Sequence, residues 1–376
     1  MKKHYVGIDL HGNNSVIGVL DENQRKVFVQ KTPNNLEVIL AFLEPYKETI
    51  VAIVVESTFN WYWLVDGLME HGYRVHLANP CAIQQYKGIK YTDDRHDAFF
   101  LAKLLLLNIL PEGYIYPRED RQVRDLLRKR LMLVRNRTAH ILSFKSLVNR
   151  NLGVSINSNV VKILEEEKID SMFGDEHLTL SAQANIGVMR YLEVRIKQLE
   201  QEILKVARLK PEFVELLNVP GIGKVLGLTI SLETGDVGRF NKVGNYASYC
   251  RNVSSNRLSN GKSKGHNNRK NGNKYLAWAY LEAAHKMKRH CAQAELFYHR
   301  KVFQRNKIVA IKALAHKISR ACYYIMRDHV SFDVTRMFGK PINPYKKDKG
   351  SGSKPVWGPD KEPLAPIGQT AATASK

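Results

Sequence analysis

Four acidic residues of this sequence stand where apolar segments begin or end, a pattern that suits metal-dependent phosphoryl chemistry. Asp9 ends an apolar run near the N-terminus, and Glu56 ends the run IVAIVVE. Asp94 and Asp97 are three residues apart at the start of a helical pattern, so they share one helix face. Carboxylate oxygens gathered at a sheet edge are ligands that Mg²⁺ prefers, and they can hold the ions used in phosphoryl transfer. We therefore predict a Mg²⁺ site, with Mn²⁺ as an alternative ion, at Asp9, Glu56, Asp94 and Asp97.

Each acid also has an ordinary structural interpretation. Asp9 could belong to the turn made by Gly12-Asn13-Asn14, and Glu56 could be a charge at a strand end. Asp94 could cap a helix, where an acid is favoured by the helix dipole. Because apolar strands seldom end in acids in this order, the four residues together favour a metal site.

The N-terminal region must supply the sheet that brings these acids together. Short apolar segments separated by turns predict strands near 5–9, 15–20, 26–31, 50–56 and 74–78. Helical patterns occur near 36–46, 60–71 and 94–110, and a longer basic helix is expected over 121–149. The first three strands are spaced as hairpins and a strand–helix–strand unit follows, so we expect an α/β fold with a mixed sheet.

The pattern changes beyond this region. Apolar residues alternate at spacings of three and four, as in a short coiled coil, at Met189, Leu192, Ile196, Leu199, Ile203 and Val206. A mostly α-helical unit follows Pro211, and the last residues are rich in glycine, serine and small side chains. We predict an N-terminal domain over 1–150, a helical coiled-coil region over 151–210, a C-terminal domain over 211–340 and a disordered tail over 341–376.

The composition identifies the class of partner. The chain has 376 residues with 58 Lys plus Arg against 36 Asp plus Glu, and its formal charge of +22 favours a phosphate polyanion. Nucleic acid is the first expectation and an anionic membrane surface the second. The N-terminus lacks a signal-peptide pattern, no apolar run is long enough to span a bilayer, and the four cysteines form no C-x-x-C pair. We expect a cytoplasmic protein without a membrane span or structural zinc.

One segment concentrates this positive charge. The sequence from Cys250 to Leu276 contains no acid and has glycines that let a backbone approach a polyanion. Its basic residues are Arg251, Arg257, Lys262, Lys264, Arg269, Lys270 and Lys274. We predict a nucleic-acid-binding loop, and a solvated loop with core aromatic residues behind it is the alternative.

A second, weaker nucleic-acid motif is Pro220-Gly221-Ile222-Gly223, which lies between two apolar helical stretches. It resembles a helix-hairpin-helix turn, in which backbone N–H groups hold a DNA phosphate at a helix N-terminus. Gly221 and Gly223 are the candidate contacts. A dinucleotide site is excluded because this glycine pair does not follow a strand.

Five segments in order, VGIDLH, VVEST, DDRHDAFFLAKLL, NVPGIGKVLGLTI and LSNGKSKGHNNRKNGNKYLAWAYLEAA, resemble transposases of the insertion sequence 110 family over nearly the whole chain. The resemblance implies an N-terminal RuvC-like domain of the ribonuclease H fold, a coiled coil, and a C-terminal transposase domain. It also implies a recombinase, prokaryotic and nucleoid-associated when bound to DNA, that acts on donor and target DNA under the guidance of a structured bridge RNA.

The family resemblance assigns roles to individual residues. Asp9, Glu56, Asp94 and Asp97 match the family's Asp-Glu-Asp-Asp set, although Asp93 precedes the closing pair where relatives usually have threonine. Ser259 matches the family's serine nucleophile, with Ser254, Ser255 and Ser263 as nearby alternatives, and Asn260 stands where many relatives have glycine. The metal site and the serine would form a composite centre across protomers of a homo-oligomer, either a dimer or a tetramer.

Three other functions remain open on the sequence. One is a Mg²⁺-dependent nuclease of the ribonuclease H type, or a Holliday-junction-type resolvase, in which Ser259 only contacts phosphate. Another is a non-catalytic nucleic-acid-binding protein with structural acids. The last is an actin-like ATPase or sugar kinase, whose glycine-rich phosphate loops have no convincing counterpart here.

Overall fold

The computed structural model describes residues 2–83, 93–207, 211–253, 258–265 and 271–339. Residues 1–332 form one unit, and the second unit, residues 333–376, contains helix α15 (Val334–Phe338). The tail expected over 341–376 lies outside the described residues, as do Arg257, Arg269 and Lys270 of the basic segment.

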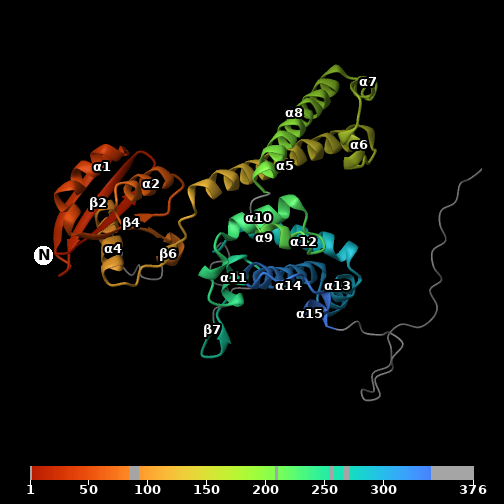
Figure 1. Ribbon diagram of the computed structural model, residues 1–376. Helices are drawn as coiled ribbons and strands as arrows, with labels where there is room; N and C mark the ends of the chain where they lie inside the picture. Colours follow the sequence, from red (N-terminus) through yellow and green to blue (C-terminus); the bar gives the residue numbers. More distant parts are fainter. Residues whose placement is uncertain (1, 84–92, 208–210, 254–257, 266–270, 340–376) are drawn as a thin grey trace, which may run out of the picture. The chain divides into compact units, whose positions relative to one another are not determined.

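The expected mixed sheet is confirmed, with six strands in the order β3-β2-β1-β4-β5-β6 (Figure 1). The strands are β1 (His4–Leu10), β2 (Asn14–Asp21), β3 (Lys26–Pro33), β4 (Ile50–Glu56), β5 (Val75–Ala78) and β6 (Glu112–Gly113). Strands β1, β2 and β3 form an antiparallel meander, β4 and β5 run parallel to β1, and β6 is antiparallel to β5. The sequence pattern did not predict β6 because two residues are too few to show a period.

Alternate residues of the strands face two different layers of helices. Val6 and Ile8 of β1 pack in a cluster with α1 (Leu36–Leu43) and α2 (Tyr62–Glu70), and η1 (Glu44–Thr49) follows α1. The opposite face contacts α4 (Asp94–Leu106), whose Leu101 packs near Val54 of β4. Helix α3 (Pro80–Ile83) follows β5. Gly7 and Asp9 of β1 therefore point towards α4.

Two glycines allow α4 to approach the sheet backbone directly. Gly7 and Gly18 are directly opposite on β1 and β2. A Cβ on Gly7 would lie 2.0 Å from the carbonyl oxygen of Ala98 and 2.7 Å from the nitrogen of Ala102, and a Cβ on Gly18 would also touch α4. This backbone contact fixes the height of the N-terminal turn of α4 above the strand end that carries Asp9.

Replacing Gly7 with alanine should therefore destabilise the protein and displace α4. We expect a loss of about 1–3 kcal/mol in the free energy of unfolding, because the added methyl group meets backbone atoms that cannot rotate away. Chemical denaturation measures this loss. Gly12→Ala is the matched control, since a Cβ there meets nothing within 4 Å. Equal stability of the two variants would show that α4 does not need the close contact.

Two long helices form the middle of the chain. Helix α5 (Arg118–Leu152) packs against α8 (Glu176–Ala207), and α6 (Ser158–Lys162) and α7 (Glu166–Asp170) lie between them in sequence. The seam predicted in α8 is buried at Met189 and Ile203, and Met189 packs in one cluster with Phe144 of α5. Arg130 of α5 also pairs with Glu200 of α8 at 2.5 Å. The partner of the predicted seam is thus a helix of the same chain.

The C-terminal region is mostly helical, as expected. Its helices are α9 (Pro211–Leu216), α10 (Lys224–Thr234), η3 (Val237–Arg239), α11 (Val243–Tyr249), α12 (Lys274–His290), α13 (Ala292–Gln304) and α14 (Lys307–Asp328). Helix α14 packs against α11, α12 and α13. In the described part of the chain, no helix combines the length and apolar character needed to cross a membrane.

Candidate active site

The ends of two neighbouring parallel strands carry the first two acids. Ile8 of β1 pairs with Val55 of β4, so Asp9 and Glu56 each follow one residue after this pair. Asp9 is two residues after Gly7, and Glu56 is two residues after Val54. Side chains alternate along a strand, so both acids lie on the face covered by α4. Asp9 is 3% exposed, whereas Glu56 is half-buried.

The first turn of α4 supplies the second pair of acids. Asp93 is the N-cap, and its side chain accepts a hydrogen bond of 2.7 Å from the backbone N–H of His96. Capping occupies Asp93, whereas Asp94 and Asp97 begin the helix on the side of Asp9. The structure therefore separates the two neighbouring aspartates that the sequence left in competition, and it is Asp94 that lies near Asp9.

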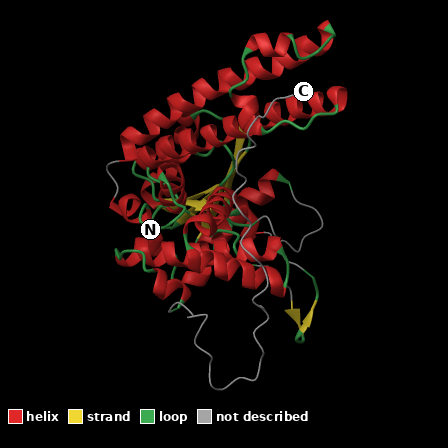
Figure 2. Cartoon of the chain, turned by 90° about the vertical axis from the view of Figure 1, so that its right-hand side faces the viewer, coloured by secondary structure: helices red, strands yellow, loops and turns green. Residues whose placement is uncertain are grey.

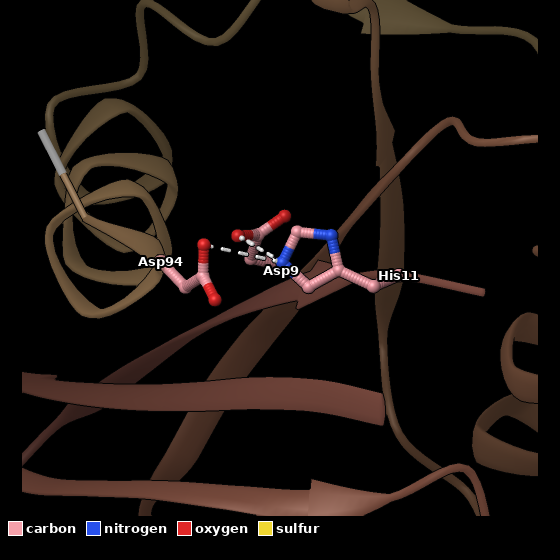
Figure 3. Close-up of side chains that lie close together, drawn as sticks. All are labelled: Asp9, His11 and Asp94. Atoms are coloured by element: carbon pink, nitrogen blue, oxygen red, sulfur yellow. Dashed lines mark ion pairs between the residues drawn. The ribbon is translucent and has the colours of Figure 1, made fainter. Parts of the chain in front are cut away.

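A histidine that the sequence reasoning missed completes this group. The Nε2 atom of His11 lies 3.2 Å from Asp9 Oδ2 and 3.4 Å from Asp94 Oδ1 (Figure 3). This nitrogen is shielded from solvent and, among the described residues, has no well-aligned hydrogen-bond partner. His11 stands two residues after Asp9, which is the spacing that places side chains on the same side of a strand. That spacing was the signal available in the sequence.

Burial and neighbouring acids raise the proton affinity of Asp9. Burial is the largest cause, followed by a hydrogen bond with Glu56 and the charges of Glu56, Asp97 and Asp94, and together they raise the pKa of Asp9 to about 8. Three of the four predicted acids thus interact with the fourth, Asp9. Lys31 of β3 lies 3.9 Å from Asp94 and supplies part of the compensating positive charge.

The arrangement fits a divalent cation. One ligand atom each from Asp9, His11 and Asp94 can be chosen so that all three lie within 4.8 Å of one another. Carboxylate oxygens suit Mg²⁺ and Mn²⁺, and the solvent-shielded Nε2 atom of His11, which lies against both carboxylates without a well-aligned hydrogen bond among the described residues, is a further potential ligand atom. A cation would also offset the burial of a charged Asp9 and its repulsion by the other acids, which together raise the pKa of Asp9.

Ser259 lies on a separate β-hairpin. Strand β7 (Leu258–Ser259) pairs with β8 (Lys262–Ser263) in a short hairpin, drawn in yellow in Figure 2. In this pairing Ser259 is opposite Lys262. Asn260 and Gly261 form the turn with φ of 50° and 72°, which is the backbone that a two-residue hairpin needs. Asparagine tolerates this conformation better than most residues, so Asn260 can take the place at which the family resemblance implies glycine in many relatives. The Ser259 side chain is exposed.

The described basic residues near this hairpin divide into two groups. Lys262, Lys264 and Lys274 are exposed, as a nucleic-acid-binding surface requires. Arg251 instead donates a hydrogen bond of 3.0 Å from Nε to the carbonyl oxygen of Gly272, so part of its bonding capacity holds the two ends of the segment together. Arg251 thus has a structural contact besides the predicted role.

The two glycines of the PGIG turn have different environments. Gly221 has φ of 89°, and a Cβ there would lie 2.6 Å from the carbonyl oxygen of Ala283 in α12, so close packing accounts for this glycine. Gly223 is exposed, is the N-cap of α10 and lines a groove of about 690 Å³. Basic side chains at this groove are Arg130, Arg135, Lys224 and Lys286, and Glu282 is an acid there.

The two predicted centres are built on different elements of the chain. The acids converge, whereas the serine is presented on an exposed hairpin of its own.

Comparison with protein families gives matches at both centres. The DEDD transposase model of IS110 elements matches residues 6–151, which include the four acids. A second model, described as the transposase IS116/IS110/IS902 family, matches residues 215–299, which include Ser259 and the PGIG turn. A search of curated proteins found no match.

Proposed function

The chain belongs to the IS110 family of transposases, which makes it an enzyme acting on DNA, and on this premise we propose that it cuts and rejoins DNA strands through a metal site and a serine. The observation that carries the proposal is the convergence of Asp9, Glu56, Asp94 and Asp97, where burial together with the interactions of the other three acids raises the pKa of Asp9 to about 8. Such a cluster is costly without a cation, and it lies within the matched DEDD region.

The four acids and His11 would hold Mg²⁺ or Mn²⁺ in a domain of the RuvC-like, ribonuclease H type. The meander β1-β2-β3 followed by the parallel strands β4 and β5 supports this assignment of the fold. When bound, the cation would polarise the scissile phosphate and balance charge on its oxygens. Asp9 and Glu56, on strands, and Asp94 and Asp97, on a helix held by Gly7, supply a rigid frame for it.

Ser259 would act as the nucleophile. Its Oγ would attack the scissile phosphate and form a phosphoserine ester, and one sugar hydroxyl would leave with the cleaved strand. Attack by another sugar hydroxyl would then join new ends and release the serine. Exposure of Ser259 on a hairpin supports delivery to DNA bound at the acids of a second protomer, so we propose a homo-oligomer.

The positive charge would hold nucleic acid. Lys262, Lys264 and Lys274 would contact DNA phosphates beside Ser259, and Gly223 with the basic groove at α10 would contact a further phosphate. A structured guide RNA would supply sequence selection. The formal charge of +22 is consistent with binding of both polyanions.

A trapping experiment tests the proposed function. Purified protein is incubated with labelled DNA from the flanks of its own element, the adjoining transcript and Mg²⁺, and the products are separated on a denaturing gel. A covalent protein–DNA band that disappears with chelator supports the proposal. Cleavage without such a band would favour the metal-dependent nuclease, and binding without cleavage would favour a non-catalytic protein.

His11 gives a test of the metal site that does not need activity. We expect His11→Ala to weaken Mn²⁺ binding about tenfold, the loss typical of disturbing a metal site, because the variant lacks a donor nitrogen beside Asp9 and Asp94. Calorimetric titration of Mn²⁺ measures it. His96→Ala is the control. His96 is on the first turn of α4, which also carries Asp94, but its ring stacks on Phe100. Tighter binding in His11→Ala would mean that His11 competes with the ion.

A further inference from the structure

An aromatic side chain is exposed beside the acids of the candidate active site. Phe59 follows Glu56 by three residues, in the turn between β4 and α2, and it is 87% exposed. Every other residue from 52 to 68 is buried or half-buried. Isolated apolar residues are common on protein surfaces, so exposure alone does not indicate a function. The position of Phe59 next to one of the four acids does.

The turn that carries Phe59 is bonded to the ends of both central strands. The backbone N–H of Thr58 donates to the carbonyl oxygen of Glu56 at 2.9 Å, and the Thr58 hydroxyl donates to Oδ1 of Asn60 at 2.9 Å. The side-chain amide of Asn60 donates to the carbonyl oxygen of His11 at 3.0 Å. His11 is the residue whose ring contacts two of the acids. The residues on either side of Phe59 are thus fixed to β4 and to the segment that follows β1.

The chemistry of this turn favours contact with a nucleobase over contact with a phosphate. The hydroxyl of Thr58 and the amide of Asn60 are engaged in the bonds that hold the turn. The ring of Phe59 has neither a charge nor a hydrogen-bond donor, and a phosphate is bound through one or the other. A flat apolar ring instead gains by leaving water, and it can stack on the face of any base.

The ring also lies within reach of DNA held at the acids. Consecutive Cα atoms are about 3.8 Å apart, so the Cα atoms of Glu56 and Phe59 are separated by at most about 11 Å. Successive nucleotides of one strand of B-DNA are about 3.4 Å apart along the axis. A phosphate at the acids therefore brings its own base, or that of one of the next few nucleotides, to Phe59.

We propose that Phe59 stacks on a base of the DNA strand whose phosphate lies at the four acids. This inference rests on the proposed function, which brings a DNA phosphate to that site. Stacking needs a free base face, so the strand is unpaired or opened at this point. Because stacking neutralises no phosphate, Phe59 adds affinity without changing the salt dependence of binding, and it selects no particular base.

Photocrosslinking locates the contact directly. Single-stranded DNA from the flank of the element carries 5-iodouracil at one position at a time, and ultraviolet light links this base to an aromatic ring stacked on it. The full-length protein is used in Ca²⁺, the measurement needs no cleavage, and mass spectrometry identifies the linked residue. We expect a crosslink at Phe59. Crosslinks only in other segments, or at Phe59 only from 5-iodouracil in the adjoining transcript, would overturn the inference.

A series of variants separates stacking from simple apolar contact. Phe59→Ala should weaken binding of the same DNA about tenfold, with an unchanged slope of log affinity against log salt concentration. Phe59→Trp should bind at least as tightly as the wild type, whereas Phe59→Leu, which is apolar but lacks a flat ring, should resemble Phe59→Ala. Phe303→Ala is the matched control, because Phe303 is 85% exposed on α13. Equal losses in Phe59→Ala and Phe303→Ala, or wild-type binding by Phe59→Leu, would contradict stacking.

The outcomes for Phe59 and for the proposed function can be told apart. A wild-type protein that crosslinks through Phe59 but forms no covalent adduct with DNA would refute the serine chemistry and support the stacking contact. A protein that forms the adduct, gives no crosslink at Phe59 and binds DNA equally well as Phe59→Ala would support the proposed function and refute the role of Phe59.

Discussion

Replacing Ser259 with alanine is expected to abolish the covalent protein–DNA adduct and to lower strand exchange by more than about 10³-fold, the scale of loss when a nucleophile is removed. The variant lacks only an exposed hydroxyl on β7, so neither the core nor the four acids proposed to bind metal are disturbed. Binding of DNA should stay within about twofold, because removing an exposed hydroxyl leaves the charge of the lysines unchanged. Denaturing gels measure the adduct, and a strand-exchange assay with labelled donor and target measures the reaction.

Ser263→Ala is the matched control for this prediction. Ser263 is also exposed, and it lies on β8 of the same hairpin, opposite Leu258. A protein in which Ser263→Ala abolishes the adduct and Ser259→Ala does not would have its nucleophile on the other strand. Full recombination by Ser259→Ala, with cleavage that still needs metal, would assign all the chemistry to the acids.

The sheet could be predicted from the sequence because its strands are short, strongly apolar and separated by clear turns. The run IVAIVVE has no helical period, and β4 forms over the same residues, Ile50 to Glu56. The acids could be predicted as a group because strand ends and a helix start are places where a charged side chain needs a reason. These inferences used only local pattern, which is what one sequence provides.

The distance between the acids could not be predicted in this way. It depends on Gly7 and Ala98, which are far apart in the sequence and are recognisable as a contact only when α4 lies on β1. The choice between Asp93 and Asp94 depends on the residue at which the helix begins, and helix ends are poorly defined by sequence. Both depend on packing between segments.

The basic segment shows the same limit. A run of positive charge without acids predicts binding, but it does not distinguish an exposed lysine such as Lys264 from Arg251, which bonds to Gly272. Nor does the sequence show that Glu233, in an apolar helix, is the partner of Asn273. Buried polar bonds between distant segments carry no periodic pattern, so they become visible only in the structure.

Replacing Asp9 with asparagine should abolish activity. In the absence of metal, the same change should raise the stability of the protein above pH 8. The raised pKa means that folded Asp9 keeps a proton up to about pH 8, whereas in the unfolded chain it ionises near pH 4. Stability linked to this proton is complete below the lower value and is lost as the pH rises through the higher one. We therefore expect the ionisation of Asp9 to lower the Tm of the metal-free wild type as the pH rises from about 4 to about 8. The Tm of Asp9→Asn should lack this contribution to its pH dependence.

At pH 8.5 and without metal, Asp9→Asn should melt on the order of 2–4 °C above the wild type, because it removes a buried charge that Glu56, Asp94 and Asp97 repel. Mg²⁺ should raise the Tm of the wild type and not that of the variant, and the variant should form no adduct.

Near pH 7, calorimetry in buffers of different ionisation enthalpy should show proton release on Mg²⁺ binding only in the wild type, since the cation favours the ionised Asp9. Glu22→Gln, which neutralises an exposed carboxylate in the turn between β2 and β3, controls for a general loss of charge. A variant that is less stable than the wild type without metal, and still stabilised by Mg²⁺, would mean that Asp9 serves the fold and not the ion.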